Sequence, residues 1–451
     1  MSRTLSDDAL GAAFEGLDRA DVRLAGRFPG EPGRRQPVHT VYGGGHLFRA
    51  GTAARLGELA LGALEEHASD PAALAEATGL ADDPPGLVDA VYARLREKLE
   101  REPVEDFRID FEDGYGHRPD EEEDGHVAAA AEEVAAGMEA GSLPPFLGLR
   151  VKPLTPELRR RSARTLDLFV TALTERTGGA LPENWVFTLP KITDPAQPVA
   201  FAAMLERLEG ECGLEPGSLR FELMVETPQS IFDADGRVAL PALVAAGDGR
   251  VTAAHFGTYD YTALLSITAA QQRMRHPACD FARDVMKIAL ANTGIWISDG
   301  STAVLPVAPH RAGEGEDLSP AQEAENRAAV HTAWRMHFED VTDSLVRGLY
   351  QGWDLHPAQL VTRYAAVYGF FLGSLDAAAD RLSNFLERAA QATLLGNVFD
   401  DAATGQGLLN FFLRAVNSRA VSEDEAIART GLSRDELATR SFVAILDGRK
   451  G

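Results

Sequence analysis

The chain has little cysteine, no long apolar run and few basic stretches. Only Cys212 and Cys279 occur in 451 residues, which excludes a disulfide framework and a cysteine-rich zinc site and suits a reducing compartment. No uninterrupted apolar run reaches the ~20 residues that span a bilayer, so no membrane association is expected. Residues 1–24 form a polar amphipathic pattern without the apolar segment of a signal peptide. We therefore expect a cytoplasmic location.

Positive charge is scarce. The 44 lysines and arginines face 68 aspartates and glutamates, which gives a formal net charge of −24. A nucleic-acid-binding protein needs a basic stripe that neutralises phosphates, and runs such as "GRRQ" and "LRRRSART" are too short to supply one. The glycine-rich nucleotide motifs GxGxxG and GxxxxGK[ST] are absent as well. No nucleic-acid partner is expected, and an anionic substrate would need a local arginine, lysine or metal ion.

Apolar, strand-like segments alternate with helical segments along most of the chain. Helical patterns closed by glycine separate them at 124–141, 155–179 and 198–213. This alternation predicts parallel strands joined by right-handed crossovers, and hence an α/β fold. Eight strands closing into a (β/α)8 TIM barrel fit best, and a doubly wound open sheet is the second interpretation. The strand candidates are 37–45, 107–116, 146–154, 184–192, 219–231, 251–263 and, more weakly, 294–307 and 349–360.

The two ends of the chain depart from this alternation. A helical region rich in Ala, Leu and Glu follows the first strand up to residue 101, and we interpret it as an N-terminal helical elaboration. Beyond residue 360, helical patterns begin with Ser, Asp and Glu, as helix starts do. We predict a barrel at residues 1–360 and a C-terminal helical lid or oligomerisation segment at 361–451. Its apolar stretches need a packing partner, so we expect it to cover an active site of this chain or of a neighbouring one.

Polar residues stand directly after the strand candidates. The carboxyl ends of barrel strands converge on one face, so these residues meet there even when they are far apart in sequence. Each one alone fits a surface or ion-pair role, but acids and bases at five strand ends indicate a shared site. They are Glu112 and Asp113, Arg150 and Lys152, Lys191, Glu226, and Asp260.

An ordered set of motifs between residues 105 and 360 resembles the citrate lyase β-subunit and malyl-CoA lyase family, of the aldolase–citrate lyase type among the pyruvate-binding TIM barrels. "IDFEDGY" resembles that family's Asp-Leu-Glu-Asp strand end, "LRVKP" its Arg-Val-Asn segment and "TLPKI" its Pro-Lys-Val. "VETPQSI" and "HFGTYDYTA" are similar to the two segments that supply its metal-binding carboxylates. "GWDLHPAQL" resembles its Ile-His-Pro-x-Gln. The N-terminal helical region and the tail lie outside the resemblance.

The resemblance implies a role for each matching residue. Glu226 and Asp260 would be the direct ligands of Mg²⁺ or Mn²⁺, with water and substrate oxygens completing the octahedron. Arg150 would bind the substrate carboxylate or the developing enolate, and so serve recognition rather than the fold. Glu112 and Asp113 would hold metal-bound waters in the catalytic centre.

The implied reaction is the cleavage or formation of a carbon–carbon bond beside a carbonyl, through an enolate. The substrate would be a 2-oxo acid or a hydroxyacyl compound, including a coenzyme A thioester, with Lys191 lining its site. A homo-oligomer is also implied. The general base stays open among His46 and tail acids such as Asp400 and Asp401. A malate-synthase-like condensing enzyme and a barrel that binds a metal and a small acid without turnover are the alternatives.

Three residues depart from the family pattern near the expected metal. Lys152 stands where an asparagine is usual, and Tyr259 and Tyr261 flank Asp260 where smaller residues are common. These departures predict added charge and bulk beside the metal. His356 follows the last strand, where we expect it to stabilise the loop.

Overall fold

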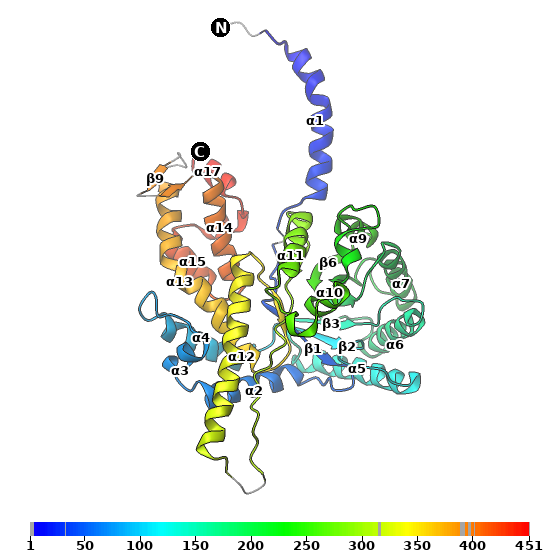
Figure 1. Cartoon of the computed structure of the whole chain (residues 1–451). Helices are drawn as coiled ribbons and strands as arrows, with labels where there is room; N and C mark the ends of the chain where they lie inside the picture. The colour runs from blue at the N-terminus through cyan, green and yellow to red at the C-terminus, as the bar shows by residue number, and fades with distance from the viewer. Residues whose placement is uncertain are drawn as a thin grey trace.

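A computed structural model describes residues 4–31, 33–313, 317–387, 393–395, 398–400 and 402–450. Eight parallel strands form one sheet in the order β7-β6-β5-β4-β3-β2-β1-β8 (Figure 1). The strands are β1 (His39–Gly44), β2 (Asp106–Asp110), β3 (Phe146–Arg150), β4 (Trp185–Leu189), β5 (Phe221–Val225), β6 (Val251–Phe256), β7 (Trp296–Ser298) and β8 (Gly352–Asp354).

The sheet closes on itself just beyond β7. Ser301 pairs with Trp353 as a parallel bridge, the Trp353 amide donates to the Gly300 carbonyl at 3.0 Å, and the Asp299 amide donates to the Gln351 carbonyl at 2.8 Å. The eight parallel strands and their surrounding helices therefore make a TIM-barrel-like fold, which confirms the expected α/β class. Both weaker strand candidates are barrel strands.

Helices cover the outside of the barrel. The outward side chains of β2 to β5 are apolar, whereas β1 and β8 turn His39 and Asp354 toward each other and Asp354 toward His337. In β2, Phe107 and Ile109 are buried against the helices, whereas Arg108 and Asp110 have the opposite parity and point into the barrel. A Cβ on Gly148 of β3 would collide with the Val186 carbonyl oxygen of β4 and would also crowd the interior Arg108 side chain, so this position requires glycine. The helices after β2 to β7 are α5 (Asp120–Ala140), α6 (Arg159–Thr177), α7 (Ala196–Cys212), α8 (Pro228–Ile231), α9 (Leu240–Ala246), α10 (Thr258–Leu264), the 3₁₀ turn η1 (Ala269–Gln271), α11 (Pro277–Leu290) and α12 (Pro320–Val346).

The N-terminal part has two different regions. Helix α1 (Asp7–Arg27) extends away from the rest of the chain and has no buried residue (Figure 1). Between β1 and β2, helices α2 (Thr52–His67), α3 (Pro71–Thr78) and α4 (Leu87–Arg101) pack against α12 and α13 (Gln359–Glu387). This second region is the expected helical elaboration. No helix in the described ranges is both long and apolar enough to cross a bilayer.

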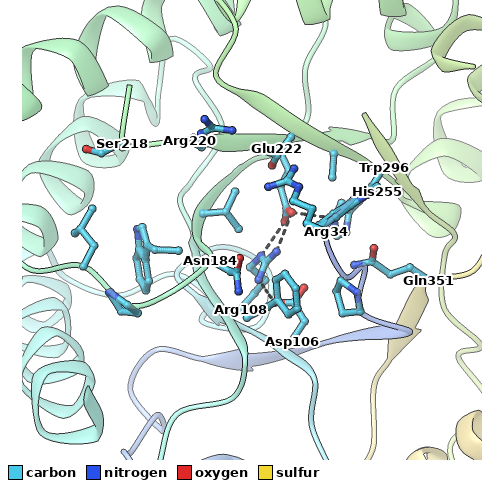
Figure 2. Close-up of a pocket in the computed structure, with 18 residues that line it drawn as sticks. Arg34, Asp106, Arg108, Asn184, Ser218, Arg220, Glu222, His255, Trp296 and Gln351 are labelled. Carbon is cyan, nitrogen blue, oxygen red and sulfur yellow. Dashed lines mark hydrogen bonds and ion pairs between the residues drawn. The ribbon is translucent and has the colours of Figure 1, made fainter. Parts of the chain in front are cut away.

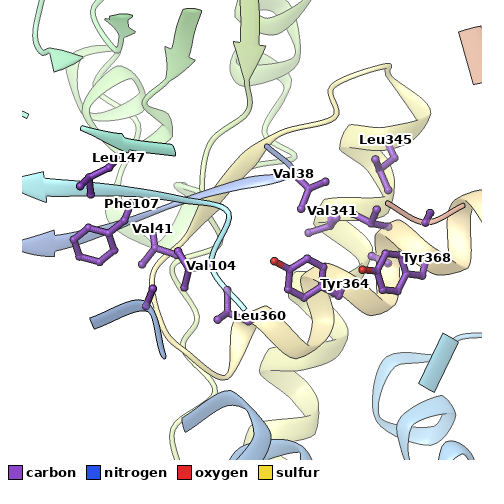
Figure 3. Packing of buried hydrophobic residues seen from close by; sticks show 14 of the residues in the cluster. Val38, Val41, Val104, Phe107, Leu147, Val341, Leu345, Leu360, Tyr364 and Tyr368 are labelled. Carbon is purple, nitrogen blue, oxygen red and sulfur yellow. The ribbon is translucent and has the colours of Figure 1, made fainter. Parts of the chain in front are cut away.

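The tail packs on the amino-end side of the barrel. Arg414 donates to the Gln36 side chain at 2.9 Å and lies 4.7 Å from the Tyr350 ring, and both partners stand just before strands. Figure 3 shows how α13 continues the core, with Tyr364 and Tyr368 beside Val38 and Val341. The predicted division at residue 360 falls inside α13 and remains a prediction. The tail elements are a hairpin of β9 (Thr393–Leu395) and β10 (Val398–Asp400), then α14 (Ala402–Asn417), α15 (Glu423–Thr430), α16 (Arg434–Thr439) and α17 (Phe442–Lys450).

Candidate active site

Two acids from consecutive strand ends form one side of the candidate site. Glu226 directly follows β5 and is buried, and its Oε1 accepts a hydrogen bond from the Lys191 amide at 2.7 Å. Asp260 lies in the first turn of α10, just after β6, with a side chain that is 40% exposed. Gly257 separates the two segments, and a Cβ there would come within 2.5 Å of Glu226 Cβ. Only glycine lets the chain after β6 pass so close to Glu226.

The Lys191 ammonium group lies at the centre of the site. Its Nζ is 2.6 Å from Glu112 Oε1, 3.0 Å from Asp113 Oδ2 and 3.3 Å from Asp260 Oδ2. The Lys191 backbone has a φ of 50°, a left-handed conformation that is uncommon outside glycine and concentrates at functional sites. That conformation directs the amide of the same residue to Glu226. One lysine therefore contacts all four predicted acids.

Arg150 ends β3 beneath this cluster. Its Nε and one terminal nitrogen donate to the two carboxylate oxygens of Asp110 at 2.7 and 2.5 Å. Its other terminal nitrogen, Nη1, lies 3.2 Å from Glu112 Oε2. The guanidinium stands 4.7 Å from the centre of the Tyr42 ring and 5.8 Å from that of Trp353. Arg150 thus has a structural role through Asp110, while Nη1 borders the acidic cluster.

Burial raises the pKa values of two central acids into the neutral pH range. Burial, assisted by the charges of Asp260 and Glu112, raises the pKa of Glu226 to about 8 against the opposing effect of Lys191. Burial also raises the pKa of Glu112 to about 7, although Arg150 and Lys191 act against it. Burial alone would lower the pKa of Lys191, but the carboxylates of Glu226 and Glu112 raise it above its ordinary value. Such shifts are typical of active sites.

The chemistry of the site fits a divalent cation with partial protein ligation. Glu226 and Asp260 offer hard oxygen donors, and Glu112 and Asp113 stand on the other side of Lys191. Within the described ranges, no group of three or more His, Cys, Asp or Glu side chains is arranged to hold a metal by itself. A cation bound by Glu226 and Asp260 would therefore need further oxygens from water and substrate, as expected for a catalytic rather than a structural site.

Comparison with known proteins places the chain in a family. A family model described as a domain of unknown function, DUF6986, matches residues 17–445. The chain belongs to the DUF6986 family. No curated protein matches it in sequence.

Solved structures share the architecture of this DUF6986 protein. A citrate lyase from Burkholderia xenovorans LB400 aligns with a TM-score of 0.54 and 18% identity, over 75% of this chain and 92% of that one. A magnesium/glyoxylate complex of Haloferax volcanii malate synthase aligns over 91% of this chain and 98% of that one, with a TM-score of 0.43 and 16% identity. At such identity the citrate lyase shows a common fold, and the malate synthase score is too low to support an argument.

The expected crowding beside the metal is wrong. Lys152 points away from Glu226, because its Nζ donates to Glu123 Oε2 of α5 at 2.6 Å and to the Phe111 carbonyl at 2.7 Å. The Tyr259 hydroxyl is bound to the backbone after β7, and the Tyr261 ring is buried in the apolar core between β6 and α11. All three side chains support the fold around the site.

The structure describes some of the candidates for the general base and not others. His46 lies at the end of β1 beside the loop of Gly114, with rings of Tyr115 and His126 5.5 and 5.8 Å away. Its Nδ1 is buried without a hydrogen-bond partner, so His46 remains a candidate. Asp401 lies outside the described residues, and for Asp400 only the backbone is described. His356 Nδ1 accepts from the Ala358 amide at 3.2 Å, which agrees with a role in holding the loop.

Sequence reasoning missed two residues of the site, Asp110 and Tyr42. Asp110 carries the bidentate contact to Arg150, and the Tyr42 ring packs under the same guanidinium. Both residues could have been found from the alternation of side chains along a strand. Asp110 is two residues before Glu112, and Tyr42 is two residues before Gly44 at the end of β1, so each points to the same side as the strand end. Residues of one parity along a barrel strand share the interior.

Proposed function

We propose that this DUF6986 protein is a metal-dependent carbon–carbon lyase of the aldolase and citrate lyase type. The substrate would be a 2-oxo acid or a hydroxyacyl compound, including a coenzyme A thioester, and the cofactor Mg²⁺ or Mn²⁺. The observation that carries the proposal is the meeting of acids from β2, β5 and β6 around Lys191, with Arg150 beside them, at the carboxyl end of the barrel. The citrate lyase with the same fold adds support.

The reaction requires three things from the protein. A proton leaves the substrate hydroxyl, and the bond between the hydroxyl-bearing carbon and the carbon α to the substrate carbonyl breaks. The hydroxyl-bearing carbon becomes a new carbonyl, and the electron pair of the broken bond remains in an enolate that is then protonated on carbon. When bound at Glu226 and Asp260, the cation supplies Lewis-acid charge to the carbonyl and carboxylate oxygens. Arg150 is preorganised by Asp110 and offers Nη1 to the negative charge that develops on the enolate oxygen.

Glu112 is the proton carrier that the site supports best. Its pKa of about 7 allows it to take up and release a proton near neutral pH, and it lies between Arg150 and Lys191. His46 is the rival, since its Nδ1 has no hydrogen-bond partner. A pH–rate profile separates them: His46→Gln would leave the profile near pH 7 intact, whereas Glu112→Gln would remove it.

The assembly and the tail complete the proposal. We infer a homo-oligomer in the cytoplasm, in which the tail at 361–451 acts on a neighbouring copy. The described tail contacts to Gln36 and Tyr350 lie on the amino-end side of this chain's own barrel. A lid function of the tail therefore requires a second chain. Light scattering of the full chain and of a chain ending near Gly373 tests this, because an unchanged oligomer with full turnover would contradict it.

The activity is tested with a panel of hydroxyacyl-CoA thioesters and 4-hydroxy-2-oxo acids in the presence of Mg²⁺ or Mn²⁺. We expect metal-dependent release of pyruvate or glyoxylate that Glu226→Gln abolishes. Glu211→Gln is the matched control, since Glu211 is exposed and pairs with its helix neighbour Arg207 at 2.5 Å. Condensation of glyoxylate with acetyl-CoA would instead favour the synthase direction. Metal binding without turnover of any substrate would contradict the proposed enzyme activity. It would favour a barrel that binds a metal and a small acid without turnover.

A further inference from the structure

A second polar cavity lies at the opposite end of the barrel from the candidate active site. Its volume is about 360 Å³, which is within the usual range for small-molecule sites. The first residues of several strands line it, among them Asp106 of β2 and Trp296 of β7, which Figure 2 labels. Trp185 of β4 lines it as well. The amino end of a TIM barrel normally serves stability, so a cavity with polar walls is unexpected there.

Arg108 holds both of the acids that line this cavity. It donates to both oxygens of Glu222 at 2.8 Å and also contacts Asp106, as the dashed lines in Figure 2 show. Thr188 donates to Glu222 at 2.5 Å, and His255 Nε2 lies 2.9 Å from the same carboxylate. Because one guanidinium faces two carboxylates, an anion in the cavity needs further positive charge.

Two further arginines add positive charge. Arg34 stands over the Trp296 ring at 4.2 Å, and Arg220 directly precedes β5. Neither forms an ion pair with a carboxylate in the described part of the chain. Burial and the nearby charge of Arg220 both lower the pKa of Arg34. With Arg108, three arginines line the cavity against two carboxylates, an excess of positive charge in a chain whose net charge is −24.

The walls also hold buried polar atoms without partners. Trp185 Nε1, His255 Nδ1 and Ser218 Oγ are all buried and have no hydrogen-bond partner in the described part of the chain, and all three residues line this cavity. Trp185 is 6% exposed and His255 is completely buried. Native proteins rarely keep several unsatisfied buried polar atoms in one place without a ligand, ion or water.

We propose that this cavity binds a small organic anion, with its carboxylate or phosphate group between Arg34 and Arg220. Guanidinium groups bind both kinds of oxyanion through paired N–H donors. The unpartnered polar atoms of Trp185, Ser218 and His255 would bind the polar part of the molecule, with the Trp185 N–H as a donor. The site lies at the amino end and is independent of the lyase chemistry proposed for the carboxyl end.

Binding is tested by titrating inorganic phosphate and, separately, malate into the full-length protein in the presence of EDTA. Calorimetry gives the stoichiometry, and tryptophan fluorescence reports on Trp185 and Trp296 in a Trp334→Phe/Trp353→Phe background, since the chain has four tryptophans. We expect saturable binding of one anion per chain by at least one probe. The Arg34→Gln/Arg220→Gln double variant should bind at least tenfold more weakly. Arg207→Gln/Arg237→Gln removes the same charge from exposed arginines paired elsewhere and should bind as the parent does.

The outcomes separate this site from the active site and the two kinds of anion from each other. Saturation by phosphate alone, or by malate alone, supports the site and identifies the charged group of its ligand. Binding that persists in the Arg34/Arg220 variant but disappears in Arg150→Met would place the anion in the active site and overturn the proposal. Absence of saturation with both probes would overturn it as well. Arg220→Gln alone gives the same answer if the double variant melts early.

Discussion

Replacing Glu226 with glutamine should stabilise the metal-free protein at alkaline pH while removing its affinity for Mg²⁺. Glu226 is fully buried and its pKa is raised from an ordinary 4.5 to about 8. Each pH unit between these two values lowers the free energy of unfolding by about 1.4 kcal/mol, so the total approaches an upper bound on the order of 5 kcal/mol. A glutamine keeps an acceptor for the Lys191 amide and carries no charge to bury.

The sign of this pH dependence follows from the number of protons that the folded and unfolded states bind. Between pH 4.5 and 8 the folded protein keeps a proton on Glu226 that the unfolded chain has already released, so the stability of the parent falls as pH rises through this window. The glutamine variant lacks this titration. We expect melting temperatures in EDTA to agree near pH 5 and the variant to melt a few degrees higher at pH 8.5, the size expected for several kcal/mol in a large protein.

Glu209→Gln is the matched control with the opposite sign. Glu209 is buried too, but hydrogen bonds from Arg250 at 2.6 and 2.8 Å lower its pKa despite burial. The same substitution there should destabilise the protein at pH 8.5 by about 3 kcal/mol or more, because a buried arginine loses its partner. If the parent and Glu226→Gln differ by the same amount at both pH values, the account of Glu226 is wrong. Equal Mg²⁺ affinities by calorimetry would exclude it as a ligand.

Three further substitutions test the surroundings of the site. Arg150→Lys keeps the charge, but a lysine cannot form both hydrogen bonds to Asp110. We therefore expect kcat/KM to fall at least tenfold and the free energy of unfolding to fall by about 2 kcal/mol. A fully active variant would contradict the role of Arg150. Lys191→Met should lower kcat at least a hundredfold. It should also shift the limb of the pH–rate profile that is due to Glu112 to higher pH, because a neighbouring cation that lowers the pKa of Glu112 is lost. An unshifted profile would argue against Glu112 as the proton carrier. Lys152→Met should cost about 3–5 kcal/mol of stability in thermal melts and leave Mg²⁺ affinity unchanged; weakened Mg²⁺ binding would return Lys152 to the site.

The strand pattern was predictable where the barrel presents an apolar environment to the outer face of a strand, as it does for the outward residues of β2 to β5. The three-residue strands β7 and β8 were weaker candidates, and β8 turns the charged Asp354 outward toward His337. The long helix α12 (Pro320–Val346) was not predicted. Its buried face mixes Val330 and Trp334 with polar residues such as His337 and Asp340, which dilutes the apolar periodicity on which a helix prediction rests.

The site was only partly predictable, because sequence gives the order of strand ends but not the direction of each side chain. Lys191 and the four acids around it were found at strand ends, and the fold brings them into contact. Lys152 is two residues beyond Arg150 but turns toward α5, since the strand has already ended and parity no longer applies. The pairing of Arg150 with Asp110 depends on the register of β2 and β3, where the two are direct neighbours, and a single sequence does not reveal register.

The interior of this barrel is a column of charges, and this explains why the same residues serve both fold and site. Arg108 pairs with two acids near the amino end, Arg150 pairs with Asp110 and Glu112 in the middle, and Lys191 pairs with three acids at the carboxyl end. Each cation is shared between acids, so removing one leaves buried charge that its neighbours cannot fully compensate. Effects of substitutions along the column should therefore be non-additive, unlike those of exposed pairs. A barrel filled with aliphatic side chains would be more tolerant of such changes, but it would give a charged substrate no preorganised field.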